Sequence, residues 1–351
     1  MVIRMPFSPT LPRIGTGVSM VRSCRFVLPL LSLLACARSS DQRPVIGLIT
    51  KTETNPFFVK MKEGAEQAAT GEQLQLLAGA GRSDGDNAGQ IAAIENQVAA
   101  GAKVILISPS DAKAIVPTIT RLRSQGVLVI ALDSPADPMD ATDGFFGTDN
   151  YRAGELIGQY AKARLGNTAP RIVTIDLVPG HPTGAQRHNG FLHGLELPTN
   201  DRTSNELAAP SQVVCMGDSI GDQAKAQAVM ETCLQKAPEL NVVYAINEPS
   251  AAGAYNALKK AGRDKDVFIV TVDGGCRGVA DVAAGRFAAT AQQYPLRMAE
   301  LGVQAAAEFL RRGTRPSGFI DTGVALVAGA RLPGVESLSV EDGTARCWGT
   351  A

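Results

Sequence analysis

The alternation of short apolar runs with amphipathic stretches most constrains the fold of this chain. The runs consist almost wholly of Val, Ile and Leu, which is typical of parallel strands buried on both faces. They are Val45–Ile49, Leu74–Leu77, Val104–Ile107, Val127–Leu132, Ile172–Ile175, Val242–Ala245 and Val267–Val272. The stretches between them predict helices at Phe58–Ala69, Asn87–Ala100, Ile115–Gln125, Ala224–Lys236 and Ala251–Ala261. This order predicts an α/β protein with doubly wound parallel sheets.

The chain also repeats itself. The stretch VILISPSDAKAIVPTITRLRSQGVLVIALD matches VVYAINEPSAAGAYNALKKAGRDKDVFIVTVD as strand, polar turn, helix, Gly, strand and Asp. The distance from Ser108 to Asp133 is 25 residues, and from Asn247 to Asp273 it is 26. Such self-similarity favours two similar α/β lobes over one long sheet.

Polar residues that follow the predicted strands form the candidate ligand site. In open parallel sheets, ligands bind beyond the carboxyl ends of the strands. The residues at such ends are Lys51, Ser108, Asp133, Asn247 and Asp273. When two lobes face each other, these groups converge on one cleft.

The sequence Asn55-Pro56-Phe57-Phe58 after the first strand has two interpretations. Asn as a helix cap, Pro in the first turn and two core Phe would explain it structurally. Alternatively, an aromatic face can lie against the apolar face of a sugar ring. We favour that use for at least one of the two Phe.

The remaining polar candidates suit a ligand rich in hydroxyl groups. Asp133 and Asp273 could each cap a turn, but their matching positions favour hydroxyl acceptors. Arg187 follows a Gly/Pro loop and suits a donor to ligand oxygens, and Gln293 precedes Pro295. Because an unpaired buried polar group costs roughly 1–3 kcal/mol, such a site rejects the wrong epimer.

The patterns of common enzymes are absent from the sequence. Gly79 and Gly81 follow a strand, but the third Gly is misplaced for GxGxxG, and neither a Walker loop nor GxSxG occurs. His181, His188 and His193 do not form HExxH, and we interpret them as loop and helix-face residues. We therefore expect no catalysis, no cofactor and no metal.

Residues 1–43 are predicted to be a secretory signal and linker outside the fold. Arg22 and Arg25 precede the ten-residue apolar run Phe26–Ala35, which is too short to span a bilayer. The run ends in Leu33-Leu34-Ala35-Cys36, which resembles a bacterial lipobox, so that Cys36 would carry a lipid anchor on the outer face of the cell envelope. A plain signal peptide is the alternative. Residues 1–19 could be an upstream extension.

The charge balance argues against a nucleic-acid partner. Residues 1–35 contain four Arg and no acid, so their removal leaves 30 basic and 34 acidic residues, a net charge of −4. Nucleic-acid binding calls for a basic patch instead.

Four cysteines remain after the signal segment: Cys215, Cys233, Cys276 and Cys347. Export makes disulfides possible, and four cysteines allow three pairings. The absence of CxxC spacing argues against structural zinc. We favour Cys215–Cys233, because a strand end and the next helix lie close, with free buried thiols as the alternative. Pairing of Cys276 with Cys347 stays open.

Taken together, several motifs resemble the periplasmic sugar-binding proteins of the ribose-binding type. They are TNPFFVKMKEGAEQAA, ISPSDAKAI, VIALD, GTDN, RHNGF, NEPSAAGAYNALKKAG, VDGG and ATAQQYP, and they extend from about Pro44 to Gly323. Within that family, GDQAKAQAVMETCLQKAPELNVVYAINEP, VDGGC and the final Cys347-Trp348-Gly349 are most similar to the fructose-binding members.

The resemblance implies a type I periplasmic binding protein with two Rossmann-like lobes and a three-crossing hinge. Residues 44–148 plus 294–322 would form the N-terminal lobe, and 149–293 plus 323–351 the C-terminal lobe. The crossings are expected near Thr148–Asn150, Gln293–Pro295 and Asp321–Gly323. The resemblance also implies a protein that closes on a monosaccharide and delivers it to an ABC permease driven by a separate ATPase. We expect the protein to be monomeric.

Family site residues match position by position at Asn55, Phe57, Phe58, Asp133, Arg187, Asn247, Asp273 and Gln293. Two positions depart from the ribose type. Lys51 stands where that type has a small hydroxyl residue, and Ser134 where it has an Arg. The exchange argues against ribose as the sole ligand and is compatible with fructose, another hexose or a pentose.

Other classes of function were weighed. A chemoreceptor-coupled sugar sensor fits the same residues. A transcriptional regulator with a similar sensing core would need a basic helix-turn-helix segment, where this chain has an apolar signal. An enzyme on this fold would need a nucleophile–base set or a cofactor loop.

Overall fold

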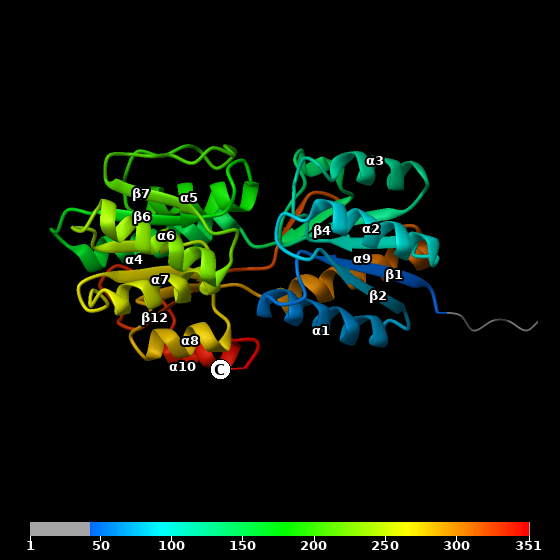
Figure 1. Cartoon of the computed structure of the whole chain (residues 1–351). Helices are drawn as coiled ribbons and strands as arrows, with labels where there is room; N and C mark the ends of the chain where they lie inside the picture. The colour runs from blue at the N-terminus through cyan, green and yellow to red at the C-terminus, as the bar shows by residue number, and fades with distance from the viewer. Residues whose placement is uncertain (1–42, 351) are drawn as a thin grey trace, which may run out of the picture. The chain divides into compact units, whose positions relative to one another are not determined.

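The strands of residues 43–350, which the computed structural model describes, form two six-stranded sheets (Figure 1). The first sheet, in what we call the N-lobe, has the order β11-β5-β4-β3-β1-β2, and every pair in it is parallel. Its strands are β1 (Val45–Thr50), β2 (Gln75–Ala80), β3 (Val104–Ile107), β4 (Leu128–Leu132), β5 (Gly144–Gly147) and β11 (Phe319–Asp321). Its helices are α1 (Pro56–Gly71), α2 (Asn87–Ala99), α3 (Val116–Ser124), a 3-10 turn at Met139–Ala141 and α9 (Pro295–Arg312).

The second sheet, in what we call the C-lobe, has the order β12-β10-β9-β8-β6-β7. Its strands are β6 (Ile172–Asp176), β7 (Val213–Asp218), β8 (Val242–Ala245), β9 (Phe268–Asp273), β10 (Ala289–Gln292) and β12 (Ala325–Ala328). Its helices are α4 (Asn150–Leu165), α5 (Pro182–Gly194), α6 (Gln223–Lys236), α7 (Glu248–Lys260), α8 (Cys276–Ala283) and α10 (Val340–Arg346). Only β12 runs antiparallel among these strands, so the sheets are dominated by parallel pairing, and the predicted fold class is confirmed.

The two lobes share one strand order. The series β2-β1-β3-β4-β5 corresponds to β7-β6-β8-β9-β10, which places the repeated stretch on β3–β4 in one lobe and on β8–β9 in the other. The chain order reverses beside β1 and beside β6, and ligands bind at such switch points in open α/β sheets.

Alternating side chains on each strand bury two separate helix layers. In the N-lobe, Ile46 and Leu48 of β1 pack with helices α1 and α9, whereas Ile105 and Ile107 of β3 pack with α2 and α3. The C-lobe repeats the arrangement, with α4 and α5 on one face and α6, α7 and α8 on the other. Burial on both faces explains why the central strands read as continuous apolar runs.

The strands at the sheet edges, and those next to β11 and β12, were harder to predict than the central ones. Strand β2 begins at Gln75, one residue after the expected Leu74, and extends to Ala80, because its pairing with β1 sets its length. Strands β5, β7, β10, β11 and β12 lay outside the predicted apolar runs. They are short or mixed in composition, and their neighbours in the sheet stabilise them.

The chain passes between the two sheets three times. The first passage, residues 148–149, joins β5 to α4; the second, residues 293–294, joins β10 to α9; the third, residues 322–324, joins β11 to β12.

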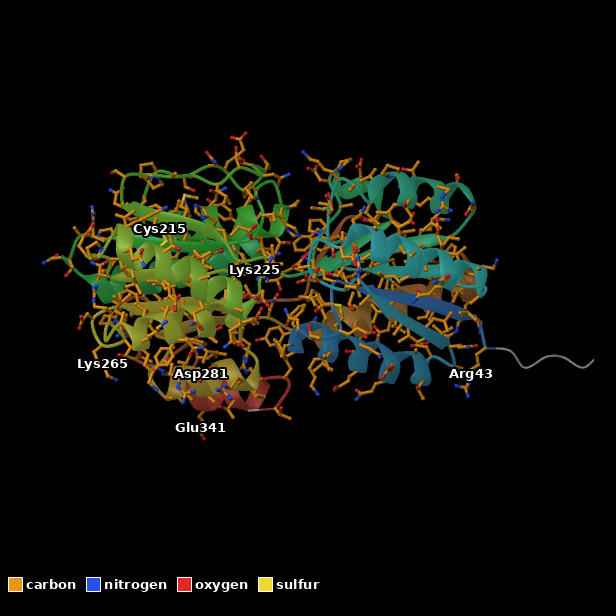
Figure 2. All side chains as sticks on the ribbon, viewed as in Figure 1. Arg43, Cys215, Lys225, Lys265, Asp281 and Glu341 are labelled. Carbon is orange, nitrogen blue, oxygen red and sulfur yellow. A yellow bond between two sulfur atoms is a disulfide. The ribbon has the colours of Figure 1, made fainter. Side chains whose placement is uncertain are left out.

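Two disulfides occur within residues 43–350. One joins Cys215 in β7 to Cys233 in α6, with Cα atoms 5.6 Å apart; it is the pairing that we favoured, and Figure 2 labels Cys215. The other joins Cys276 to Cys347, the pair that had stayed open. Cys36 and the signal segment lie outside the described residues. No helix within residues 43–350 has the length and apolar character needed to cross a membrane.

Candidate functional site

The two repeat-matched acids occupy unusual backbone conformations. Asp133 directly follows β4 with φ 64°, and Asp273 ends β9 with φ 143°. Residues other than glycine rarely adopt positive φ, and such strain gathers at ligand and active sites. Both side chains are almost fully buried.

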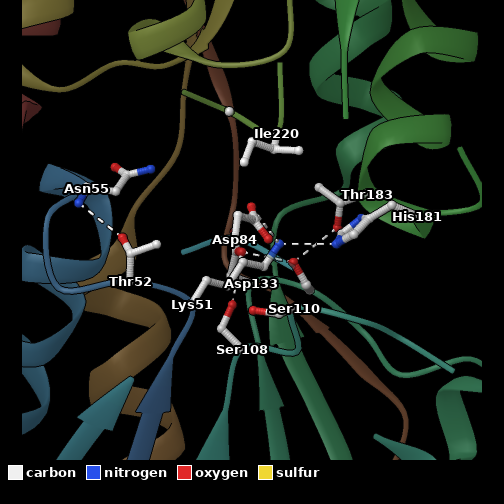
Figure 3. Close-up of polar contacts among 12 residues, drawn as sticks. Lys51, Thr52, Asn55, Asp84, Ser108, Ser110, Asp133, His181, Thr183 and Ile220 are labelled. Atoms are coloured by element: carbon white, nitrogen blue, oxygen red, sulfur yellow. Dashed lines mark hydrogen bonds and ion pairs between the residues drawn. The ribbon is translucent and has the colours of Figure 1, made fainter. Parts of the chain in front are cut away.

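Hydroxyl groups of the N-lobe orient Asp133. Ser108 Oγ donates to Asp133 Oδ2 over 3.2 Å, and Ser134 Oγ donates to the same oxygen over 3.0 Å (Figure 3). Thr183 at the start of α5 in turn donates to Ser134 Oγ over 3.4 Å. The carboxylate therefore stands at a point where side chains of the two lobes meet.

Lys51 makes a second contact between the lobes. It follows β1, and its Nζ lies 3.1 Å from Nε2 of His181, the residue before α5, and 3.7 Å from Oδ2 of Asp84 (Figure 3). Burial first, and then the charges of Lys51 and Arg187, hold the pKa of His181 well below its usual range. The imidazole is therefore neutral, and its Nε2 accepts a hydrogen bond from the Lys51 ammonium group. Its Nδ1 has no hydrogen-bond partner among the described residues.

Arg187 and Gln293 connect the C-lobe to the second passage. Arg187 lies on α5 and donates through Nε to Asn150 Oδ1 over 2.7 Å, and through its terminal nitrogens to the Ile246 carbonyl and to Gln293 Oε1. Gln293 Oε1 also accepts from Thr148 Oγ1 in the first passage over 2.9 Å. The amide of Gln293 thus joins two of the three passages through one oxygen.

The surroundings of Asp273 raise the pKa of its carboxyl group. It accepts from Gln293 Nε2 over 2.8 Å and from the Glu248 backbone N–H over 3.2 Å. Burial raises its pKa to about 6, although Arg187 and these donors act in the opposite direction. Burial also raises the pKa of Glu248 well above its usual range, and the charge of Asp273 adds to this rise. A buried carboxylate with remaining acceptor capacity suits a hydroxyl donor.

The residues of the first loop cap α1 and pack in the N-lobe core. Asn55 caps α1 by accepting from the Phe57 N–H over 3.0 Å, as the structural interpretation predicted. Phe57 and Phe58 both belong to the N-lobe core, with their rings edge to face at 5.3 Å. Asn247 likewise caps α7, and its Nδ2 donates to the Gly221 carbonyl over 3.2 Å.

A groove of about 1270 Å³ opens along the facing surfaces of the lobes. Of the predicted site residues, Asn55, Phe58 and Asp273 line it. The other predicted residues do not line the groove, and all but Asn247 are nearly fully buried; they are Lys51, Phe57, Ser108, Asp133, Ser134, Arg187, Asn247 and Gln293. The structure thus places three of the predicted residues on the groove and most of the others among buried side chains behind it.

Sequence reasoning missed several residues of this region. His181 was interpreted as a loop residue, yet it is buried and contacts Lys51 from the opposite lobe. His188 lies on α5, as its interpretation as a helix-face residue predicted, but sequence reasoning missed that it is fully buried and bonded to Asp176 and the Ala208 carbonyl. Ile220 lines the groove with φ 47°, which is strained for a β-branched residue. Its position after the Asp218-Ser219 strand end was the only available signal.

Trp348 also lines the groove and was not predicted to do so. Its side chain is buried against Phe57, and nothing in the local sequence pattern indicates that contact. Within the described residues, no group of three or more His, Cys, Asp or Glu side chains could hold a metal ion.

Comparisons with known proteins agree with this architecture. A family model described as "Periplasmic binding protein domain" matches residues 46–314, more than half of the chain. A D-ribose/D-allose-binding protein of Pseudomonas aeruginosa is 28% identical over 315 residues, which cover 87% of this chain and 94% of that protein.

Solved structures show the same fold. The periplasmic component of an ABC-type sugar transport system from Hahella chejuensis is 29% identical with a TM-score of 0.70, covering 81% of this chain and 99% of that one. A carbohydrate transporter solute-binding protein from Agrobacterium radiobacter, in complex with D-arabinose, is 25% identical with a TM-score of 0.72, covering 83% and 96%. With its two doubly wound lobes, its three passages and its match across residues 46–314, the chain belongs to the periplasmic binding protein domain family.

Proposed function

We propose that this protein is the sugar-binding subunit of a bacterial ABC importer and that it binds one monosaccharide between its lobes. The observation that carries the proposal is the pair Asp133 and Asp273, which end matching strands of the two lobes on strained backbone. A ligand that bridges two such acceptors must carry several hydroxyl donors, as a sugar does.

The donors around these acids support a polyol ligand. Arg187, Lys51 and the Nδ1–H of His181, which has no partner within residues 43–350, are buried donors, while Asn55, Phe58 and Asp273 line the groove. Relatives described as binding ribose or allose, and a similar structure that holds D-arabinose, are consistent with a pentose or hexose. We propose fructose or another hexose as the first candidates, because Lys51 and Ser134 replace the residues expected for ribose.

In this proposal the lobes exchange between open and closed forms, and the sugar contacts both lobes only in the closed form. The sugar then shifts the population by its differential affinity for that form. The permease would read the closed surface and receive the sugar, with transport driven by a separate ATPase. The domain boundaries, the monomeric state and the lipid on Cys36 are parts of the same proposal.

The direct test is calorimetric titration of the protein from about Ser39 onward, after unfolding and refolding to remove any co-purified ligand. The panel is fructose, ribose, mannose, glucose, galactose, xylose and inositol. We expect one-to-one binding of one or two of these sugars. Asp273→Ala and Arg187→Ala should each abolish that binding, since each leaves buried partners unpaired.

Asp266→Asn is the matched control, because Asp266 is exposed in the same lobe and pairs with Arg263. It should bind the sugar as the wild type does. The absence of heat with every sugar would contradict the proposal. A Cys36→Ser variant that stayed in the membrane fraction of cells would contradict the lipid anchor alone.

Uptake and chemotaxis assays on a deletion strain distinguish a role in import from a role in sensing. A deletion strain should lose uptake of the radiolabelled sugar that the protein binds. Normal uptake combined with lost chemotaxis would favour the sensor alternative.

A further inference from the structure

The segment that follows α10 returns to the groove and joins both lobes. Its Cys347 forms a disulfide with Cys276, the first residue of α8 in the C-lobe. Next to this bond, the Cys276 N–H donates to the Trp348 carbonyl over 2.9 Å. Residues 347 and 348 are therefore attached to α8 by one covalent bond and one hydrogen bond.

The side chain of Trp348 lies in the other lobe. Its ring meets Phe57 of α1 edge to face, with centroids 5.5 Å apart, and it is counted with the N-lobe core. Phe57 in turn meets Phe58 edge to face, and Phe58 lines the groove. A single aromatic series thus runs from the C-terminal segment to the groove wall.

Trp348 also contacts the hinge. Its Nε1–H donates over 2.7 Å to the carbonyl of Gln293, whose side chain binds Asp273 and accepts from Arg187 and Thr148. The space around the indole is closely filled, since a Cβ added at Gly275 would lie 3.2 Å from its ring. The indole is therefore held on three sides: by the disulfide-linked backbone, by Phe57 and by the second passage.

We propose that Trp348 is a ligand-positioning residue and that the Cys276–Cys347 disulfide keeps it in place. The inference rests on the proposed sugar-binding function. In the closed form the indole supports the Phe57–Phe58 wall and fixes the backbone of Gln293 beside Asp273. Without the Cys276–Cys347 disulfide, the segment that follows α10 is free to move. The Phe57–Phe58 pair and Gln293 then have to become ordered each time a sugar binds.

This arrangement predicts that oxidation of the cysteine pair tightens sugar binding. Ordering of a loosened segment is a cost that binding must overcome, and a preformed wall removes that cost. We expect the effect mainly in the dissociation rate, because the loss concerns contacts of the closed form.

The test compares two double variants, C276S/C347S and C215S/C233S. Each removes one disulfide, but Cys215 and Cys233 join β7 to α6 and do not line the groove. The chain contains one tryptophan, so selectively excited tryptophan fluorescence reports on Trp348 alone. We expect C276S/C347S to bind its sugar on the order of tenfold more weakly, with faster dissociation and red-shifted emission. C215S/C233S should keep the wild-type affinity and emission.

Two further variants separate positioning from bulk stability. Trp348→Phe keeps an aromatic ring against Phe57 but removes the Nε1–H that donates to the Gln293 carbonyl. Trp348→Ala removes both the ring and this donor. We expect an intermediate affinity for the first and the largest loss for the second. Wild-type affinity in Trp348→Ala, accompanied only by a lower melting temperature, would overturn the inference.

The outcomes also distinguish this inference from the function on which it rests. A wild-type protein that binds no sugar overturns both. A wild-type protein that binds tightly, together with a C276S/C347S variant that binds equally tightly in calorimetry and stopped-flow fluorescence, overturns the positioning role of Trp348 alone.

Discussion

At the residue scale, the chemistry of the site depends on where a polar group is buried. Asp133 and Asp273 occupy equivalent positions, yet their surroundings differ. Asp133 accepts from two serine hydroxyls, whereas Asp273 accepts from one side-chain amide and from the backbone N–H of Glu248. Burial raises the pKa of Asp273 to about 6, so this acid titrates near physiological pH.

The affinity for sugar should therefore fall in mild acid. A hydroxyl donor binds the ionised form of Asp273 much more strongly than the neutral form, and at a pH below its pKa of about 6 the ionised form becomes the minority. We expect binding at pH 5 to be on the order of tenfold weaker than at pH 7.5, one pKa unit being equivalent to a factor of ten. Calorimetry at pH 5, 6 and 7.5 measures this change.

In the absence of sugar, the contribution of Asp273 to the free energy of unfolding changes with pH in the opposite direction to the affinity. The pKa of Asp273 is higher in the folded than in the unfolded chain, so the folded state holds this proton more tightly. The Asp273 contribution to the free energy of unfolding thus decreases as pH rises from about 4 to 6.

The control for the pH dependence of affinity is Asp266→Asn, which should retain that dependence. If a binding-competent Asp273→Asn variant showed the same dependence, another group would be responsible for it.

At the element scale, the close approach of α4 and α5 sets the position of Arg187. Gly154 and Gly158 on α4 face Gly190 and Gly194 on α5, and a Cβ at any of them would meet backbone of the other helix within about 2.2 Å. Four glycines at a spacing of four residues therefore allow the two helices to pack backbone to backbone. Arg187 and Asn150 come close enough for a 2.7 Å hydrogen bond because of this packing.

Gly154→Ala should destabilise the protein and weaken sugar binding together. The added Cβ would lie 2.1 Å from the Arg187 carbonyl oxygen, so α5 must shift. We expect a loss of about 1–3 kcal/mol in the free energy of unfolding, as for other overpacked sites. Urea denaturation and calorimetry measure the two effects.

Gly71→Ala is the control for this substitution. Gly71 is the last residue of α1, and a Cβ there meets no atom within 4 Å. Its stability and affinity should match those of the wild type. An unchanged Gly154→Ala variant would show that the helix contact does not position Arg187.

At the scale of the whole molecule, the lobes are joined by passages and by side chains. The contacts of Lys51 with His181 and of Thr183 with Ser134 cross from one lobe to the other, as does the Asn205 Nδ2 bond of 3.0 Å to Asp137. These contacts exist only when the lobes face each other closely. A sugar that binds between the lobes should therefore stabilise both together.

Saturating sugar should raise the stability of the whole described unit. At a free concentration of 100 times Kd, a ligand that binds only the folded state adds about 2.7 kcal/mol to the free energy of unfolding. Urea denaturation followed by circular dichroism measures this gain, and small-angle X-ray scattering should show a smaller radius of gyration with sugar. Galactitol or another polyol that gives no heat in calorimetry is the control. Tight binding without compaction would contradict closure of the lobes.

The fold class and the family were predictable from the sequence and are confirmed. Both depend on patterns that lie within short stretches: the apolar runs at Val104–Ile107 and Val242–Ala245, the intervening helices and the strand-ending Asp residues. The match of Asp133 with Asp273 was visible because a βαβ unit has a nearly constant length. The ligand roles of the eleven candidate residues and the identity of the sugar stay predictions.

The sequence by itself determined the apolar strands of both sheets, the amphipathic helices between them and the polar groups at the strand ends, because hydrophobic period and βα spacing act locally. Only the tertiary structure decided that Lys51 meets His181, 130 residues away, and that Trp348 packs on Phe57 while its neighbour Cys347 is bonded to α8. Such contacts depend on how two separately formed lobes face each other. Packing of the two lobes brings together residues that lie far apart in the sequence. No local sequence pattern therefore predicts these contacts.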